Sequence, residues 1–132
     1  MKTITIETRE QNQMIDITSI VGKIVRESGV QQGVCFVFVP HTTAAVTINE
    51  NADKDVPRDI LNTLSKLVPY KDNYKHMEGN ADAHVKATLI GNTASVIINN
   101  GTLVLGTWQS LFFCEFDGPR TRKVIVKVIG EK

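Results

Sequence analysis

The three histidines of this sequence are the residues best suited to chemistry, and two of them lie in one short segment. His76 and His84 are the end residues of HMEGNADAH, and His41 follows the apolar run GVCFVFVP. A neutral imidazole offers a nitrogen lone pair near neutral pH. Three of them could bind zinc or a similar divalent ion and leave one position open for water or substrate. Their spacing matches no local ligand motif, so isolated surface histidines are the alternative interpretation.

The segment between His76 and His84 contains further groups of use in a site. Glu78 supplies a carboxylate, Gly79 a flexible turn and Asn80 an amide. These three residue types in one loop favour a binding or catalytic segment over a merely polar one.

A second dense set of polar residues follows His41. Its members are Thr42, Thr43, Asn49, Glu50, Asn51 and Asp53. Turn and cap chemistry explains part of this set, Asp53 in particular. It does not readily explain Glu50 together with both asparagines, so we expect part of the set to face a pocket.

The third candidate segment is GTWQSLFFCEFDGPRTR, residues 106–122. Trp108 can offer an aromatic wall, Gln109 an amide and Glu115 a carboxylate. Arg120 or Arg122 can offer a guanidinium fork for phosphate. The alternative makes Trp108 a core residue, Glu115 an edge residue and the arginines part of a solvated turn.

Hydrophobic periodicity predicts the elements that must position these residues. Strands are expected at 3–8, 14–18, 33–40, 44–49, 93–99, 102–108 with a continuation through 110–116, and 123–130. Helices are expected at 19–28, about 54–68 and 83–91. Gly29 should end the first helix and Asp82 should cap the third, while 14–18 could pair with 3–8.

The strongest local pattern is Asn100-Gly101 between two strand-like runs, which is typical of a type I′ hairpin turn. Strands outnumber helices, and regular strand–helix–strand alternation is absent. We therefore predict an α+β fold, with a largely antiparallel sheet and packed helices in a single compact domain, residues 1–132.

Composition narrows the class of protein. A chain of 132 residues with 42% hydrophobic and 22% charged residues is typical of a globular domain. A net charge of +1, without a basic stripe that contains aromatic residues, argues against nucleic acid as a partner. No apolar run is long enough to span a bilayer, and the N-terminus lacks the apolar region of a signal peptide. Cys35 and Cys114 show no CxxC spacing, which favours buried reduced thiols in a cytoplasmic protein.

Three segments, HTTAAVTINENAD, HMEGNADAHVKATLIG and NGTLVLGTWQSLFFCEFDGPR, resemble in this order the YjbQ family, also called the secondary thiamine-phosphate synthase family. The resemblance covers nearly the whole chain. It implies a compact α+β fold, a homotrimer, and a polar pocket where the histidines gather as a metal site. On this chain those histidines are His41, His76 and His84. The implied polar groups of the pocket are Asn49, Asn51, Asp53, Glu78, Gly79 and Glu115.

The family name also implies an activity, in which a thiazole phosphate is joined to a hydroxymethylpyrimidine diphosphate and pyrophosphate is released. That reaction needs a cation or an arginine for the departing diphosphate and a wall to stack the pyrimidine. Arg120, a bound metal and Trp108 could meet these needs. The chain has no Gly-rich phosphate loop, however, so the sequence fits a phosphorylated small molecule without specifying that pair.

The expected site can now be stated in full. The metal would be zinc, or magnesium with a diphosphate substrate, and it would be held by His41, His76 and His84. The candidate catalytic residues are Glu78, Glu115 and Asp53. The candidate substrate-binding residues are Thr42, Asn49, Asn51, Gly79, Asn80, Trp108, Gln109 and Arg120.

Two other functions stay open. One is metal-assisted hydrolysis, with water in the open metal position and Glu78, Glu50 or Asp53 as the base. The other is a trimeric metal- or ligand-binding module whose transferase activity is incidental.

Overall fold

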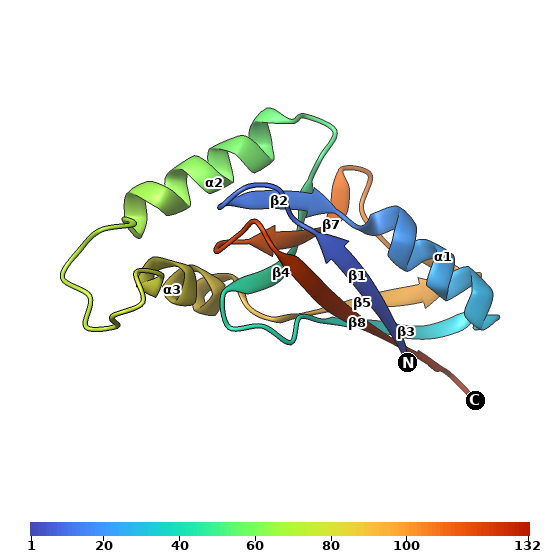
Figure 1. Cartoon of the computed structure of the whole chain (residues 1–132). Helices are drawn as coiled ribbons and strands as arrows, with labels where there is room; N and C mark the ends of the chain where they lie inside the picture. Colours follow the sequence, from blue (N-terminus) through green and yellow to red (C-terminus); the bar gives the residue numbers. More distant parts are fainter.

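The computed structural model describes residues 1–132, which form two antiparallel sheets and three helices (Figure 1). In chain order the elements are β1 (Lys2–Glu7), β2 (Gln13–Asp16), α1 (Thr18–Ser28), β3 (Gln32–Phe38), β4 (Ala44–Glu50), α2 (Asp55–Leu67), α3 (Ala81–Ile90), β5 (Thr93–Asn99), β6 (Thr102–Leu103), β7 (Gln109–Glu115) and β8 (Thr121–Gly130). One sheet has the strand order β1-β8-β3-β5-β6 and the other β2-β7-β4. The predicted α+β fold with antiparallel sheets is confirmed.

The main core lies between the two sheets and α1. Alternate residues of the five-stranded sheet point into it, for example Cys35 and Val37 of β3, which are fully buried. Val21 and Val25 of α1 and Phe113 of β7 pack in the same cluster. This alternation in burial is the two-residue period of a β-strand.

A second, smaller core lies on the opposite face of the three-stranded sheet. Phe112 and Cys114 of β7 point into it and meet Ala83 and Ala87 of α3. Because both faces of β7 are covered, four consecutive residues of this strand, Leu111 to Cys114, are apolar. The small alanines let α3 lie close to the sheet, and this packing fixes the start of α3, where His84 lies. Figure 1 shows α2 and α3 together at one end of the molecule and α1 at the other.

Local turn and cap predictions are confirmed at two places. Asn100 and Gly101 have φ values of 52° and 75°, as the tight turn between β5 and β6 requires. Gly29 follows α1 with a φ of 73°, where its N–H donates to the carbonyl of Arg26.

Three local predictions are wrong. β2 pairs with β7 and not with β1. A two-residue period shows which face of a strand is buried, but it does not show with which other strand it pairs. In the three-stranded sheet Met14 and Ile15 each find apolar cover, one in each core. The strand expected at 102–108 ends at Leu103. A turn follows, in which the Gln109 N–H donates to the Gly106 carbonyl, and β7 begins there in the other sheet.

The third correction concerns the cap of α3. Asp82 does not cap this helix, which begins at Ala81, two residues before the expected start, with Asn80 at the N-cap position. Asp82 lies in the first turn, where one carboxylate oxygen is 3.3 Å from Lys86 Nζ, and both side chains are buried. The burial of Asp82 beside Lys86 turns its carboxylate away from the free N–H groups at the helix start, and no hydrogen bond joins it to them.

None of the three helices is long and apolar enough to cross a membrane.

Replacing Gly33 with alanine should weaken the pairing of β3 with β8. A Cβ atom at this position would lie 2.0 Å from the Ile129 carbonyl oxygen and 2.9 Å from Gly130 Cα, both backbone atoms. We expect the free energy of unfolding in urea to fall by about 1–3 kcal/mol. Gly22→Ala in α1 is the matched control, since its nearest neighbour is Arg26 Nη1 at 3.5 Å. That control should be neutral or stabilising by up to about 1 kcal/mol, and an equal loss in both variants would refute the argument.

Candidate functional site

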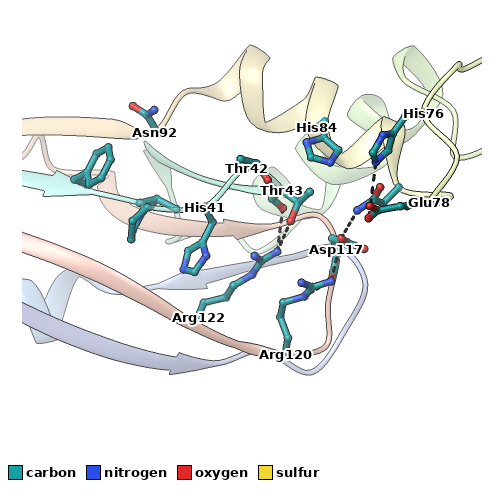
Figure 2. Close-up of a pocket in the computed structure, with 14 residues that line it drawn as sticks. His41, Thr42, Thr43, His76, Glu78, His84, Asn92, Asp117, Arg120 and Arg122 are labelled. Carbon is teal, nitrogen blue, oxygen red and sulfur yellow. Dashed lines mark hydrogen bonds and ion pairs between the residues drawn. The ribbon is translucent and has the colours of Figure 1, made fainter.

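The three histidines line one open pocket with a volume of about 730 Å³ (Figure 2). His41 lies in the connection from β3 to β4, His76 in the loop before α3, and His84 in the first turn of α3. The complete lining is Phe38, Val39, Pro40, His41, Thr42, Thr43, His76, Glu78, Asn80, His84, Asn92, Asp117, Arg120 and Arg122. The packing of α3 on the three-stranded sheet thus brings together histidines that are far apart in the sequence.

The imidazole rings of His76 and His84 lie next to each other in the pocket. Their ring centroids are 5.1 Å apart and the rings are nearly perpendicular, at 80°. Two imidazoles that share one tetrahedral zinc ion have centroids about 5 Å apart, given the usual zinc–nitrogen distance. Glu78 adds a carboxylate oxygen 3.9 Å from His76 Nε2. The donor types and the spacing of this pair therefore fit a divalent ion.

His41 is oriented differently. Its Nε2 accepts a hydrogen bond of 2.9 Å from the backbone N–H of Lys123, so the neutral ring carries its proton on Nδ1. Burial, and then the positive charge of Arg122, lower the pKa of His41 below its usual 6.5. Neither ring nitrogen has a free lone pair in this conformation. As the side chains stand, no three His, Cys, Asp or Glu groups are placed to hold one ion. A three-histidine site would require His41 to rotate and give up this bond.

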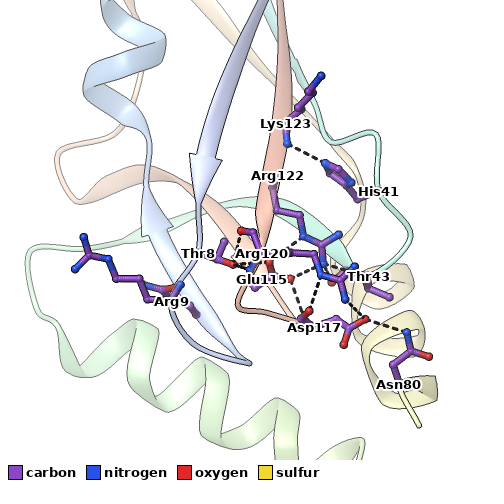
Figure 3. Close-up of polar contacts among 11 residues, drawn as sticks. Thr8, Arg9, His41, Thr43, Asn80, Glu115, Asp117, Arg120, Arg122 and Lys123 are labelled. Atoms are coloured by element: carbon purple, nitrogen blue, oxygen red, sulfur yellow. Dashed lines mark hydrogen bonds and ion pairs between the residues drawn. The ribbon is translucent and has the colours of Figure 1, made fainter. Parts of the chain in front are cut away.

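Arg122 forms one wall of the pocket and is held from behind by Glu115 (Figure 3). Its Nε donates to Glu115 Oε1 at 2.8 Å, and its Nη2 donates to Glu115 Oε2 and, at 2.8 Å, to Thr43 Oγ1. The side chains of Arg122 and Glu115 are 3% and 0% exposed. Arg122 lines the pocket and Glu115 does not, so the positive end of this pair faces the pocket.

Glu115 is placed beneath the pocket wall and does not line it, which disfavours the predicted catalytic role. Oε1 also accepts from Thr8 Oγ1 at 2.8 Å, and Oε2 from the Asp117 N–H at 3.0 Å. Burial opposes ionisation, but the hydrogen bonds from Arg122, Asp117 and Thr8 outweigh it and lower the pKa of Glu115. A carboxylate with both oxygens occupied and a lowered pKa is a poor acid or base near neutral pH.

Arg120 lines the pocket, as expected for a substrate-binding residue, but its guanidinium group is occupied. Its Nε donates to the Asp117 carbonyl at 2.8 Å, and its Nη2 to Asp117 Oδ2 at 3.0 Å. Asn80 Nδ2 donates to the same carboxylate at 2.9 Å. Asp117 itself lines the pocket, so the charge of Arg120 is compensated at the pocket surface.

Five predicted site residues lie away from the pocket: Asn49, Asn51, Asp53, Trp108 and Gln109. β4 separates them from His41, because this strand of seven residues is about 20 Å long. Asn49 lies near its far end, Asn51 and Asp53 follow that end, and Gln109 pairs with Glu50 there, directly after Trp108. Asp53 Oδ1 accepts from the Asp55 N–H at the start of α2, and Asn51 Nδ2 donates to Asp16. Gln109 accepts from the Gly106 N–H, and Trp108 is 63% exposed. Asn51 and Asp53 thus hold the connection from β4 to α2, and Gln109 holds the turn before β7.

The remaining predicted residues lie in or beside the pocket. Thr42, Glu78 and Asn80 line it, whereas Gly79 lines a smaller neighbouring cavity with Tyr70 and Tyr74. The sequence reasoning missed Asp117 and Asn92. Asp117 begins DGPR, a turn pattern that places a carboxylate beside arginine, but no local pattern identifies Asn92.

The free energy of unfolding should depend on pH through the ionisation of Glu115. Its folded-state pKa is lower than the ordinary 4.5, so the unfolded chain binds the proton more readily. The stabilisation from this group is fully present above pH 4.5 and is lost as the pH falls through the folded-state pKa. We expect the free energy of unfolding, measured in urea, to decrease as the pH falls below 4.5. Glu115→Gln, which has no ionisable group here, should show a flatter dependence, and identical slopes would contradict the assignment.

Comparison with known proteins identifies the family. Residues 2–131 match the family model described as UPF0047 protein YjbQ-like. A UPF0047 protein of Methanocaldococcus jannaschii is 50% identical, and the match covers 96% of this chain and 92% of that protein. The UPF0047 protein YugU of Bacillus subtilis is 47% identical over 98% of this chain and 99% of its own length.

Solved structures agree with the sequence matches. The crystal structure of a YjbQ/UPF0047 family protein from Clostridium acetobutylicum superposes with a TM-score of 0.96 at 56% identity, covering 98% of this chain and 100% of that one. A YbjQ-like protein from Sulfolobus solfataricus gives a TM-score of 0.95 at 38% identity, covering 98% of this chain and 96% of that one. The chain belongs to the YjbQ-like UPF0047 family.

Proposed function

We propose that the protein is a metal-dependent enzyme that acts on a phosphorylated small molecule in the three-histidine pocket. The observation that carries this proposal is the convergence of His41, His76 and His84 on one polar pocket that Arg122 also lines. Imidazole groups suit zinc, and magnesium is the alternative if the substrate carries a diphosphate.

The residues of the pocket would have different roles. His76 and His84 would hold the ion, and His41 would join them if its ring rotates. The ion would supply positive charge to a departing or reacting phosphoryl oxygen. Glu78 is the best placed base, because its side chain lines the pocket and is 75% exposed. Asp53 and Glu115 are occupied elsewhere.

The candidate activity is the synthesis of thiamine phosphate, which the family resemblance suggests. The thiazole nitrogen would form a bond to the methylene carbon of the pyrimidine while the bond from that carbon to the diphosphate oxygen breaks. Pyrophosphate would leave with the electron pair of the broken bond. Pocket groups that stabilise negative charge on the leaving oxygens would lower the barrier.

The test uses protein freed of metal with EDTA and then supplied with zinc or magnesium. Pyrophosphate release that requires metal and both substrates would support the synthase. Phosphate release from the pyrimidine diphosphate alone would favour metal-assisted hydrolysis instead. Tight metal binding without turnover of either kind would refute the enzyme and favour a binding module.

A homotrimer in the cytoplasm completes the proposal. The outer face of the five-stranded sheet carries exposed apolar side chains, among them Phe36, Phe38, Ile97 and Ile129, which are 38%, 40%, 63% and 49% exposed. Contiguous apolar surface of this kind is typical of an interface, and the number three comes from the family resemblance. The two cysteines are buried and free, as suits a reducing compartment.

Light scattering should therefore give the mass of a trimer at micromolar concentration. Ile97→Lys, which places a charge on the outer face without touching the pocket, should shift the protein toward monomer. Thr63→Lys on the exposed surface of α2, outside this sheet, is the control and should leave the mass unchanged. A monomer mass for the unmodified protein across the micromolar range would refute the oligomer.

A further inference from the structure

We infer that Arg122, with the hydroxyl of Thr42, forms a preorganised subsite for a phosphoryl group. The ligand class rests on the proposed function, whereas the location of the subsite rests on the contacts of Arg122 alone. The inference therefore replaces Arg120, the arginine that the sequence favoured, with its buried neighbour.

The first argument is that one nitrogen of a buried guanidinium group is left for the pocket. Nε and Nη2 donate to Glu115 and Thr43, while Nη1 donates to no protein atom. Nη1 is not among the enclosed polar atoms that lack a partner, so it opens on the pocket that Arg122 lines. Figure 2 shows the guanidinium group beside Thr43, between His41 and Asp117.

The second argument is the fixed position of this side chain. An exposed arginine loses considerable rotamer entropy when it binds a ligand. Arg122 has already lost this rotamer entropy on folding, because Glu115 and Thr43 hold its guanidinium group and its side chain is 3% exposed. Glu115, Thr43 and, through Glu115, Thr8 are thus positioning residues for the subsite.

The third argument comes from the contrast with Arg120. Both arginines are paired with a carboxylate, but the partner of Arg120, Asp117, lies in the pocket lining. An incoming phosphate would meet that negative charge at close range. The partner of Arg122 lies behind it, outside the lining, so a phosphate would meet the donor first.

Thr42 supplies the second donor. It lines the pocket, is exposed, and its hydroxyl makes no hydrogen bond within the protein. It directly precedes Thr43, the residue that fixes Nη2 of Arg122. A phosphoryl group has enough oxygens to accept from both Nη1 and this hydroxyl.

The test is to measure the binding of inorganic phosphate to metal-free protein by titration calorimetry in the presence of EDTA. We expect saturable binding that Arg122→Lys weakens about tenfold or more, since an ammonium group cannot keep the fixed fork. Arg120→Gln should change the affinity less than about threefold. Acetate should compete poorly; equal competition would make this a general carboxylate site and overturn the phosphoryl assignment.

A second pair of variants guards against a folding defect in Arg122→Lys. Thr43→Val removes the hydroxyl that holds Nη2 and should weaken phosphate binding, whereas Thr43→Ser keeps the hydroxyl and should restore it. Absence of saturable phosphate binding, or equal effects of Arg120→Gln and Arg122→Lys, would overturn the inference. Because metal is excluded, such a failure leaves zinc binding and turnover to be judged separately.

Discussion

Replacement of Glu115 with alanine should lower the free energy of unfolding by about 3–5 kcal/mol. The variant leaves the guanidinium group of Arg122 buried at 3% exposure without its counter-ion. It also removes the acceptor for Thr8 and for the Asp117 N–H. Urea unfolding in EDTA, at neutral pH, measures this loss without any contribution from metal.

Two further variants isolate the buried charge as the cause. Arg120→Gln breaks the other arginine–carboxylate pair, in which the arginine side chain is 49% exposed, and should cost no more than about 1 kcal/mol. Glu115→Leu combined with Arg122→Met removes both buried charges and should be less destabilising than Glu115→Ala. If Glu115→Ala cost no more than Arg120→Gln, the pair would not be the structural element described above.

Replacement of His84 with alanine should weaken zinc binding by about a hundredfold or more, because a ligand loss exceeds the effect of losing a supporting group. The folded metal-free protein should change little, since the inner face of α3 is formed by Ala83 and Ala87 and not by His84. Zinc content after dialysis and calorimetric titration would measure the first effect, and melting in EDTA the second. Zinc should raise the melting temperature of the parent protein and not of the variant.

Val85→Ala is the matched control on the same helix turn, because Val85 is 41% exposed and lies outside the pocket. It should bind zinc like the parent protein. His41→Ala should weaken binding less than His84→Ala, since His41 must first break its bond with the Lys123 N–H. Retention of full zinc content by His84→Ala would show that HMEGNADAH is a polar loop and that the proposed metal site is absent.

The sequence by itself determined two tight turns and the buried face of the first strand. Turn and stop residues act within a few positions, so Asn100-Gly101 and Gly29 were located correctly. Alternation of polar and apolar residues in TITIET fixed which face of β1 is buried, because a strand's side chains alternate whatever its partner is. The three histidines and Glu78 were also recognised from residue type alone, and all four line one pocket.

Only the tertiary structure decided which segments meet. Asn49 and Asp53 follow His41 closely in sequence, yet one strand length carries them away from the pocket, while Arg122 and Asp117 come from the far end of the chain to join it. Lys86 is buried at 1% exposure because Asn12 and Ser65, from two other segments, meet it beside Asp82 of its own helix. Burial of a charge depends on partners that only the packed fold supplies, and for the same reason Glu115 became a support for Arg122 instead of a pocket residue.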